Sequence, residues 1–204
     1  MRSRRAQTPD NIVPMAFVEF DGVAPYDPDP VMAALPRDDK TRALFFDNLR
    51  RAYDRERVQC PDFPRVPFAQ VERSAYNQAM LDACAKLWPD RPLATSLFEI
   101  GRGVYPHFAS TMVGKAIFSV AGLDYVKMAT LSPRAYSVAN ERGTVELLQA
   151  EHGFVHVRFS DLWDFPPYAC GVWHGGLDVC GHTLASLELD DLAPGTFELR
   201  IGYA

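Results

Sequence analysis

The chain has 204 residues, of which 48% are hydrophobic and 23% are charged, the balance of an ordinary globular protein. A chain of this length forms one domain that can bury its own core. The formal net charge of −5 argues against a surface that binds nucleic acid. The first residues lack the apolar stretch of a signal peptide, and no apolar run is long enough to cross a bilayer. We therefore expect a cytoplasmic protein with reduced cysteines, a disordered tail over residues 1–10 and a single domain over residues 11–204.

The first half of the chain has the hydrophobic spacing of helices, interrupted by proline-rich stretches. Either Asp38 or Asp39 is expected to cap the first long helix. Three prolines within residues 60–67 predict an extended connector, because proline and the residue before it both disfavour helix. In chain order, the expected elements are a strand over 12–22, a loop or short helical turn over 24–36, a helix from 38 or 39 to about 54, the connector, and helices over 74–88, 91–105 and 108–120.

In the second half the hydrophobic period changes to the alternation of strands. Between two predicted hairpins, two prolines at 166 and 167 and a glycine at 181 mark the beginning and end of a helix. A helical half followed by paired strands predicts an α+β fold, in which an antiparallel sheet of about four to five strands packs against four to five helices. The expected strands lie over 144–150, 154–159, 183–189 and 197–203.

Four stretches of the chain resemble one protein family. They are TRALFFDNL at 41–49, LWPDRPL and IGRGVYPHF within 80–108, TMVGKAI at 111–117 and YACGVWHGGLDV at 168–179. In these motifs the chain is similar to domain-of-unknown-function family 2378, a paralogous set expanded in myxobacteria. That family is distantly similar to haem-nitric-oxide-binding and four-vinyl-reductase domains and to a vesicle-tethering subunit. The resemblance implies helices that cover an antiparallel sheet around an apolar pocket, and it implies no activity, since a fold does not assign a function.

The resemblance raises the question of haem. A histidine that binds haem iron would be expected on a helix before the first hairpin, but residues 122–143 contain no histidine. Met128, Tyr125 and the more distant His107 are the alternative iron ligands. We therefore do not expect a haem cofactor.

Four residues near the end of the chain form the nearest approach to a metal-binding pattern, namely Cys170, His174, Cys180 and His182. Cys170 and His174 are four residues apart, so one helix face could present both to zinc. The other two would have to fold back from the end of the helix, and structural zinc sites usually place two ligands in a tight turn. We prefer a packing helix that carries a buried cysteine, and we do not expect zinc.

The same helix carries three glycines, Gly171, Gly175 and Gly176. Each costs about 1 kcal/mol of helix propensity relative to alanine, so some interaction must offset it. Plain core packing, or close approach of the helix backbone to a sheet, another helix or a ligand, would supply that interaction.

No catalytic pattern stands out, because the chain lacks a G-x-S-x-G nucleophile turn and a phosphate-binding glycine loop. We expect a non-catalytic module that binds a small apolar ligand, or that regulates or docks a protein partner. An enzyme of unrecognised type that uses a histidine or cysteine, and a structural homodimer, are the alternatives, and nucleic acid is not expected as a partner. The residues expected to line a ligand pocket are Arg102, His107, Phe108, Met112, Phe118, Tyr136, Trp173 and Leu177.

Overall fold

The structure is a computed structural model that describes residues 25–110, 115 and 122–204. The strand expected over 12–22, the expected tail and most of the helix expected over 108–120 lie outside the described residues. The helices are α1 (Asp29–Ala34), η2 (Ala43–Phe45), α2 (Phe46–Arg55), α3 (Arg73–Leu87), α4 (Leu93–Arg102), α5 (Val104–Ser110), α7 (Tyr125–Ala139) and α8 (Pro166–Cys180).

A four-stranded antiparallel sheet fills the second half, in the order β3-β4-β6-β5. Alternate residues of each strand point to the same face, so Val155, Val157 and Phe159 of the second strand are all fully buried. Phe159 pairs with Phe197 across the sheet centre, and their rings stack with centroids 4.5 Å apart. The structure thus confirms the predicted alternation. The strands are β3 (Thr144–Glu151), β4 (Phe154–Ser160), β5 (Leu184–Ala193) and β6 (Thr196–Tyr203).

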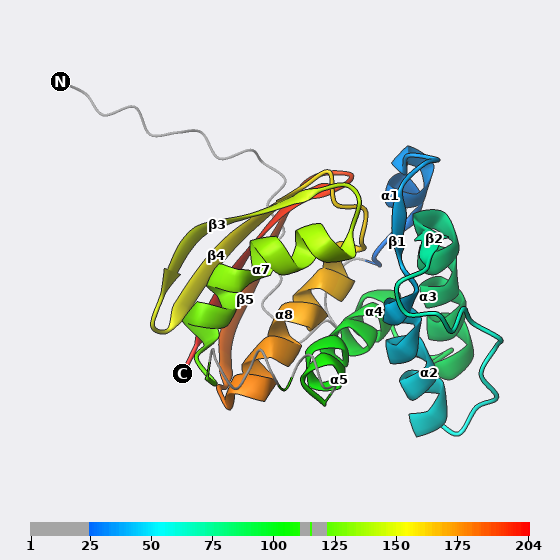
Figure 1. Ribbon diagram of the computed structural model, residues 1–204, viewed down its shortest axis with the longest axis horizontal. Helices are drawn as coiled ribbons and strands as arrows, with labels where there is room; N and C mark the ends of the chain where they lie inside the picture. Colours follow the sequence, from blue (N-terminus) through cyan, green and yellow to red (C-terminus); the bar gives the residue numbers. More distant parts are fainter. Residues whose placement is uncertain (1–24, 111–114, 116–121) are drawn as a thin grey trace.

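Helices α7 and α8 cover the apolar face of this sheet (Figure 1). Trp173 and Leu177 of α8 are fully buried in the cluster that includes the sheet residues. The helix has prolines in its first turn, where no backbone N–H is needed. It ends at Gly181, whose φ of +75° is a conformation that glycine adopts without strain. Both predicted ends of α8 are therefore confirmed.

On the other side of α8, helices α2, α3 and α4 form a second hydrophobic cluster (Figure 1). Helix α4 crosses α8 at backbone contact. A Cβ on Gly171 would overlap the carbonyl oxygen of Phe98 and lie 2.8 Å from Arg102 N. A Cβ on Gly175 would overlap the carbonyl of Arg102, and one on Gly101 would lie 3.0 Å from Val172 N. Gly171 and Gly175 of α8 therefore allow the backbones of α8 and α4 to come into contact.

A buried arginine ties the two sides together. Arg73, at the beginning of α3, is 1% exposed and pairs with Asp39 at 3.3 Å and with Asp164 just before α8. It also donates a hydrogen bond to Asn140 at the end of α7. This arrangement corrects the expected cap at Asp38 or Asp39: the helix begins only at Phe46, because Asp39 binds Arg73. The residues after Asp39 form a short strand, β1 (Lys40–Arg42), which pairs with a second short strand just before α3, β2 (Gln70–Glu72).

Two further boundaries differ from the prediction. The helix expected over 91–105 is divided at Gly103 into α4 and α5, and Pro106 falls in the first turn of α5, where proline is tolerated. Helix α7 had no predicted counterpart, and Pro133 lies inside it. The α+β fold class is confirmed, with more helices than expected. Among the described residues, none of the helices combines the length and the apolar character that a membrane crossing requires.

Candidate functional site

Polar side chains from three helices meet inside the apolar core, between α5, α7 and α8. We call Tyr105, Tyr125, Ser132, Tyr136 and Trp173 the tyrosine–tryptophan cluster. The hydroxyls of Tyr105 and Ser132 are 3.3 Å apart, and Ser132 Oγ donates to the backbone oxygen of Met128 at 3.1 Å. The Tyr125 hydroxyl donates to the backbone oxygen of Trp173 at 3.2 Å. Helix α7 places its three members of the cluster on one face, since they lie seven, four and eleven residues apart, close to whole numbers of helical turns.

The indole of Trp173 has no hydrogen-bond partner for Nε1, although its side chain is fully buried. An indole N–H is a donor only, and burying it without an acceptor costs about 1–3 kcal/mol. The Tyr136 hydroxyl lies close enough to the indole of Trp173 that the indole offsets part of the rise in the pKa of Tyr136 caused by burial. The two groups nevertheless lack hydrogen-bond geometry. The core therefore contains a buried donor for which the described residues supply no acceptor in hydrogen-bond geometry.

The cluster carries no charge at neutral pH. Burial raises the pKa of Tyr105 and raises that of Tyr125 well above its usual value. Burial first, and then the neighbouring Tyr105, raise the pKa of Tyr136 in the same way. A set of neutral hydroxyls and one N–H donor can bind a neutral polar group, and it provides neither a base nor an acid for catalysis near pH 7.

The residues expected to line a pocket do not form one set. Tyr136 and Trp173 are neighbours within the cluster, and Leu177 is buried with Trp173 among the sheet residues. Arg102 pairs with Asp178 at the surface, Nε to Oδ2 at 2.6 Å. His107 lies on α5 with its Nε2 3.9 Å from Asp47 of α2. Phe108 is a partly buried residue of α5, and Met112 and Phe118 lie outside the described residues.

The metal-binding pattern is not assembled. His174 stacks on Phe98 of α4, with ring centroids 5.4 Å apart, whereas Cys170 lies in the core against the sheet. His182 packs on Tyr203 at 4.8 Å, beyond the end of α8. Throughout the part of the chain that the structure describes, no three histidine, cysteine or carboxylate side chains are grouped to hold a metal ion.

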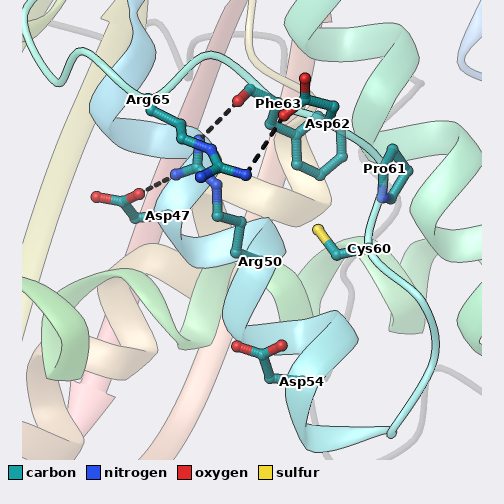
Figure 2. Close-up of a pocket in the computed structure, with 8 residues that line it drawn as sticks. All are labelled: Asp47, Arg50, Asp54, Cys60, Pro61, Asp62, Phe63 and Arg65. Atoms are coloured by element: carbon teal, nitrogen blue, oxygen red, sulfur yellow. Dashed lines mark hydrogen bonds and ion pairs between the residues drawn. The ribbon is translucent and has the colours of Figure 1, made fainter.

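An open surface depression of about 630 Å³ lies away from the cluster, between α2 and the connector (Figure 2). Arg50 spans it, paired with Asp47 and hydrogen-bonded to the backbone of the connector. Charged groups of both signs line it, and Arg50 pairs with Asp47 and Arg65 with Asp62. The lining residues are Asp47, Arg50, Asp54, Cys60, Pro61, Asp62, Phe63 and Arg65.

Comparison with protein families matches residues 37–202 to the family described as "Protein of unknown function (DUF2378)". The chain belongs to this family. The matched residues include all four motifs of the sequence analysis, so the match confirms the resemblance drawn from them. No curated protein matches this DUF2378 chain by sequence.

Solved structures of H-NOX proteins share the fold. A point mutant of the H-NOX protein from T. tengcongensis aligns with a TM-score of 0.62 at 12% identity, over 80% of this chain and 97% of that one. An H-NOX protein from S. oneidensis in the Fe(II)NO ligation state aligns with a TM-score of 0.61 at 11% identity, over 80% and 99%. The Fe(II) unliganded H-NOX protein from K. algicida gives 0.58 at 10% identity, over 79% and 95%. Identities this low establish the fold alone.

The described residues of this DUF2378 domain do not fit haem. Helix α7 has no histidine, and its two alternative ligands are packed into the core at 7% exposure for Met128 and 1% for Tyr125. The Met128 methyl group lies where a Cβ on Gly176 would be, and Tyr125 sits edge-on to Tyr203 at 5.0 Å. A flat macrocycle between α7 and α8 would displace both side chains.

Sequence reasoning named Tyr136 and Trp173 as pocket residues and Tyr125 as an alternative iron ligand, and it missed Tyr105 and Ser132. Tyr105 falls within a predicted apolar helix, and the tyrosines spaced along 105, 125 and 136 are the one signal that points to it. Ser132 lies in a segment to which no helix was assigned, so its facing direction was not available.

Proposed function

We propose that this DUF2378 domain is a non-catalytic regulatory module that binds a small neutral molecule at the tyrosine–tryptophan cluster, without haem. The observation that carries the proposal is the fully buried, unpaired Nε1 of Trp173. Such a group is rare in a native core and calls for an acceptor from a ligand or an ordered water. The similarity of the fold to H-NOX proteins, which include an Fe(II) unliganded form and an Fe(II)NO form, supports a binding role for the region between α7 and α8.

The ligand is expected to be neutral. The nearest charges that affect Tyr136 are Asp164 and Arg73, which already pair with each other. A charged ligand would lose its hydration without gaining an ion-pair partner, which costs far more than one hydrogen bond returns. A small, mostly apolar molecule with one hydrogen-bond acceptor matches the unpaired indole donor and the apolar side chains of the surrounding core.

Two features disfavour the alternatives of an enzyme that uses a cysteine and of a homodimer through the glycine face, and a third bears on location. Burial raises the pKa of the Cys60 thiol, that of Cys84 to about 12 and that of Cys180 to about 11, so these thiols are protonated and poor nucleophiles. The glycine face of α8 is occupied by α4, so a homodimer would have to use another surface, such as the edge strands β3 or β5. The four cysteines are all free, which supports a cytoplasmic location.

Native mass spectrometry of the protein purified from its own cells tests the proposal. We expect a retained neutral molecule that is lost in Trp173→Phe, a variant that removes the donor with little change of shape. Trp163→Phe is the matched control, because Trp163 Nε1 already donates to Asp161 at 2.7 Å near the surface.

A probe series gives a second readout. Cyclohexanone, methylcyclohexane and cyclohexanecarboxylate have similar sizes. The first carries a neutral hydrogen-bond acceptor, the second carries no polar group and the third carries a negative charge. We expect cyclohexanone to raise the melting temperature most, and this preference to disappear in Trp173→Phe. A protein that is isolated empty and whose stability none of these probes changes contradicts the proposal, as does a Soret band on addition of haem.

A further inference from the structure

The connector between α2 and β2 is an ordered, exposed proline-rich strap, which we define as residues 60–68. Its prolines at 61, 64 and 67 recur every third residue. Proline fixes its own φ, and the residue before each proline is kept extended, so six of the first eight residues are restricted to polyproline-type backbone. Such a helix has three residues per turn, and its side chains fall on three faces.

The burial pattern follows that period of three over residues 60–65. Cys60 and Phe63, three residues apart, are the partly buried positions and face the domain. Asp62 and Arg65, again three apart, form an ion pair at 3.6 Å on a second face, although both side chains are at least 84% exposed. Pro61 and Pro64 are exposed on the third face. The strap therefore presents its prolines to solvent.

The domain holds the strap along its inner face. The Phe63 ring packs on Phe46 with centroids 5.0 Å apart. Arg50 Nη2 donates to the backbone oxygen of Phe63 at 3.1 Å (Figure 2). It also donates to the backbone oxygen of Pro64. At the far end, Leu44 N donates to the backbone oxygen of Pro67 at 2.8 Å, and Arg42 to that of Phe68 at 3.2 Å. A peptide fixed in this way loses little conformational entropy when it binds a partner.

The end of the strap is apolar and exposed. A turn closed by Ala69 N donating to the backbone oxygen of Val66 at 3.0 Å displays Val66 and Phe68, which are 67% and 71% exposed. These are the most exposed large hydrophobic side chains of the described residues. Neighbouring apolar side chains that are exposed together are typical of interaction sites, whereas single exposed ones are common.

We infer that the proline strap is a docking ridge for a second protein that has a groove lined by aromatic side chains. Evenly spaced exposed prolines beside apolar anchors are the chemistry that such grooves bind. The ridge fits a lipid surface less well, because it carries Asp62 and the chain has a net charge of −5. A second copy of the chain does not match, since Phe68 is the single aromatic residue among the exposed large hydrophobics of the described surface.

Photo-crosslinking in the native cell, with the full chain, tests this inference. A benzophenone amino acid replaces Phe68, and the control carries it at Leu131, an exposed position on α7. We expect position 68, and not 131, to crosslink to one protein beside a tryptophan or tyrosine of that protein.

The partner is then purified and its affinity measured by calorimetry. Val66→Ser with Phe68→Ser is expected to weaken binding about tenfold or more, and Leu131→Ser to leave it unchanged. Pro61→Ala with Pro64→Ala loosens the strap without removing the anchors, and is expected to weaken binding by a smaller factor. Because all these positions are exposed, circular dichroism should be unchanged. Crosslinks to lipid or to a second copy of the chain overturn the inference, and so does the absence of any crosslinked protein. A partner whose affinity is unchanged by the Val66 and Phe68 substitutions overturns it as well.

Discussion

The two faces of α8 are packed in opposite ways. Toward the sheet, α8 presents large side chains, and Trp173 and Leu177 are fully buried among sheet residues. Toward α4 it presents glycines, and the two helix backbones meet with no side chain between them. The same helix thus joins a sheet at side-chain distance and a helix at backbone distance. The comparison teaches that a face without side chains can be the most demanding contact in a core, because it leaves no flexible atoms to yield.

Gly171→Ala with Gly175→Ala is the strongest test of this comparison. Each new Cβ would meet carbonyl groups of α4, so the two helices must separate, and we expect a loss of about 5 kcal/mol, a large fraction of the stability of a domain. Helix propensity alone predicts a gain of about 1 kcal/mol per site, so the sign of the change is diagnostic.

Gly176→Ala is the matched control on the face toward α7. Its Cβ would meet the methyl end of Met128, which can rotate away, and we expect a change within about 1 kcal/mol. Urea unfolding of the three proteins makes the measurement. Similar losses for the control and the double variant would show that backbone contact is not the cause.

Arg73→Met probes the second connection between the two sides. It leaves Asp39 and Asp164 buried without their cation, and we expect a loss of about 3–5 kcal/mol. Arg102→Met removes the half-exposed pair between α4 and α8, and we expect about 1 kcal/mol or less. Equal losses in urea unfolding would contradict the view that burial sets the strength of these links.

Glu198 tests the outer face of the sheet, which is remote from α8. Burial by itself acts to raise the pKa of Glu198, but hydrogen bonds from Arg158 and His156 lower it below its usual value. Its stabilising effect is therefore present above the unfolded pKa of about 4.3 and is lost as the pH falls through the lower folded pKa.

We expect Glu198→Gln to cost about 1–2 kcal/mol at pH 7 and to flatten the loss of stability between about pH 5 and 3. Unfolding curves at several pH values measure both effects. A variant that keeps the full acid dependence would assign that dependence to other carboxylates.

The smallest expected effect comes from His174, at the α4 side of α8. Burial first, and then Arg102, lower its pKa, so the folded state favours the neutral ring that stacks on Phe98. The associated stability is present above the unfolded pKa of about 6.5 and is lost as the pH falls below it. His174→Gln should weaken the dependence of the melting temperature on pH between about pH 7.5 and 5.5. If that dependence is unchanged, it would be assigned to His107, whose pKa burial also lowers.

The elements that could be predicted are those whose signals are local. The alternation of Val155, Val157 and Phe159 identifies β4 because one face of the strand is buried. Proline in the first turn and Gly181 at the end delimit α8 because each acts through its own backbone geometry. The apolar character of Trp173 made it a candidate, but that character is shared by many core residues.

Only the tertiary structure decided what distant residues do to one another. Asp39 looked like a helix cap because caps are local, yet it binds Arg73, which is 34 residues away. The sequence required that something offset the glycines of α8, and the structure identified α4 as the partner. Tyr105, Ser132 and Trp173 come from three helices, so no spacing along the chain relates them. The physical reason is the same in each case: a local pattern determines which way a backbone turns, whereas a contact depends on how whole elements pack.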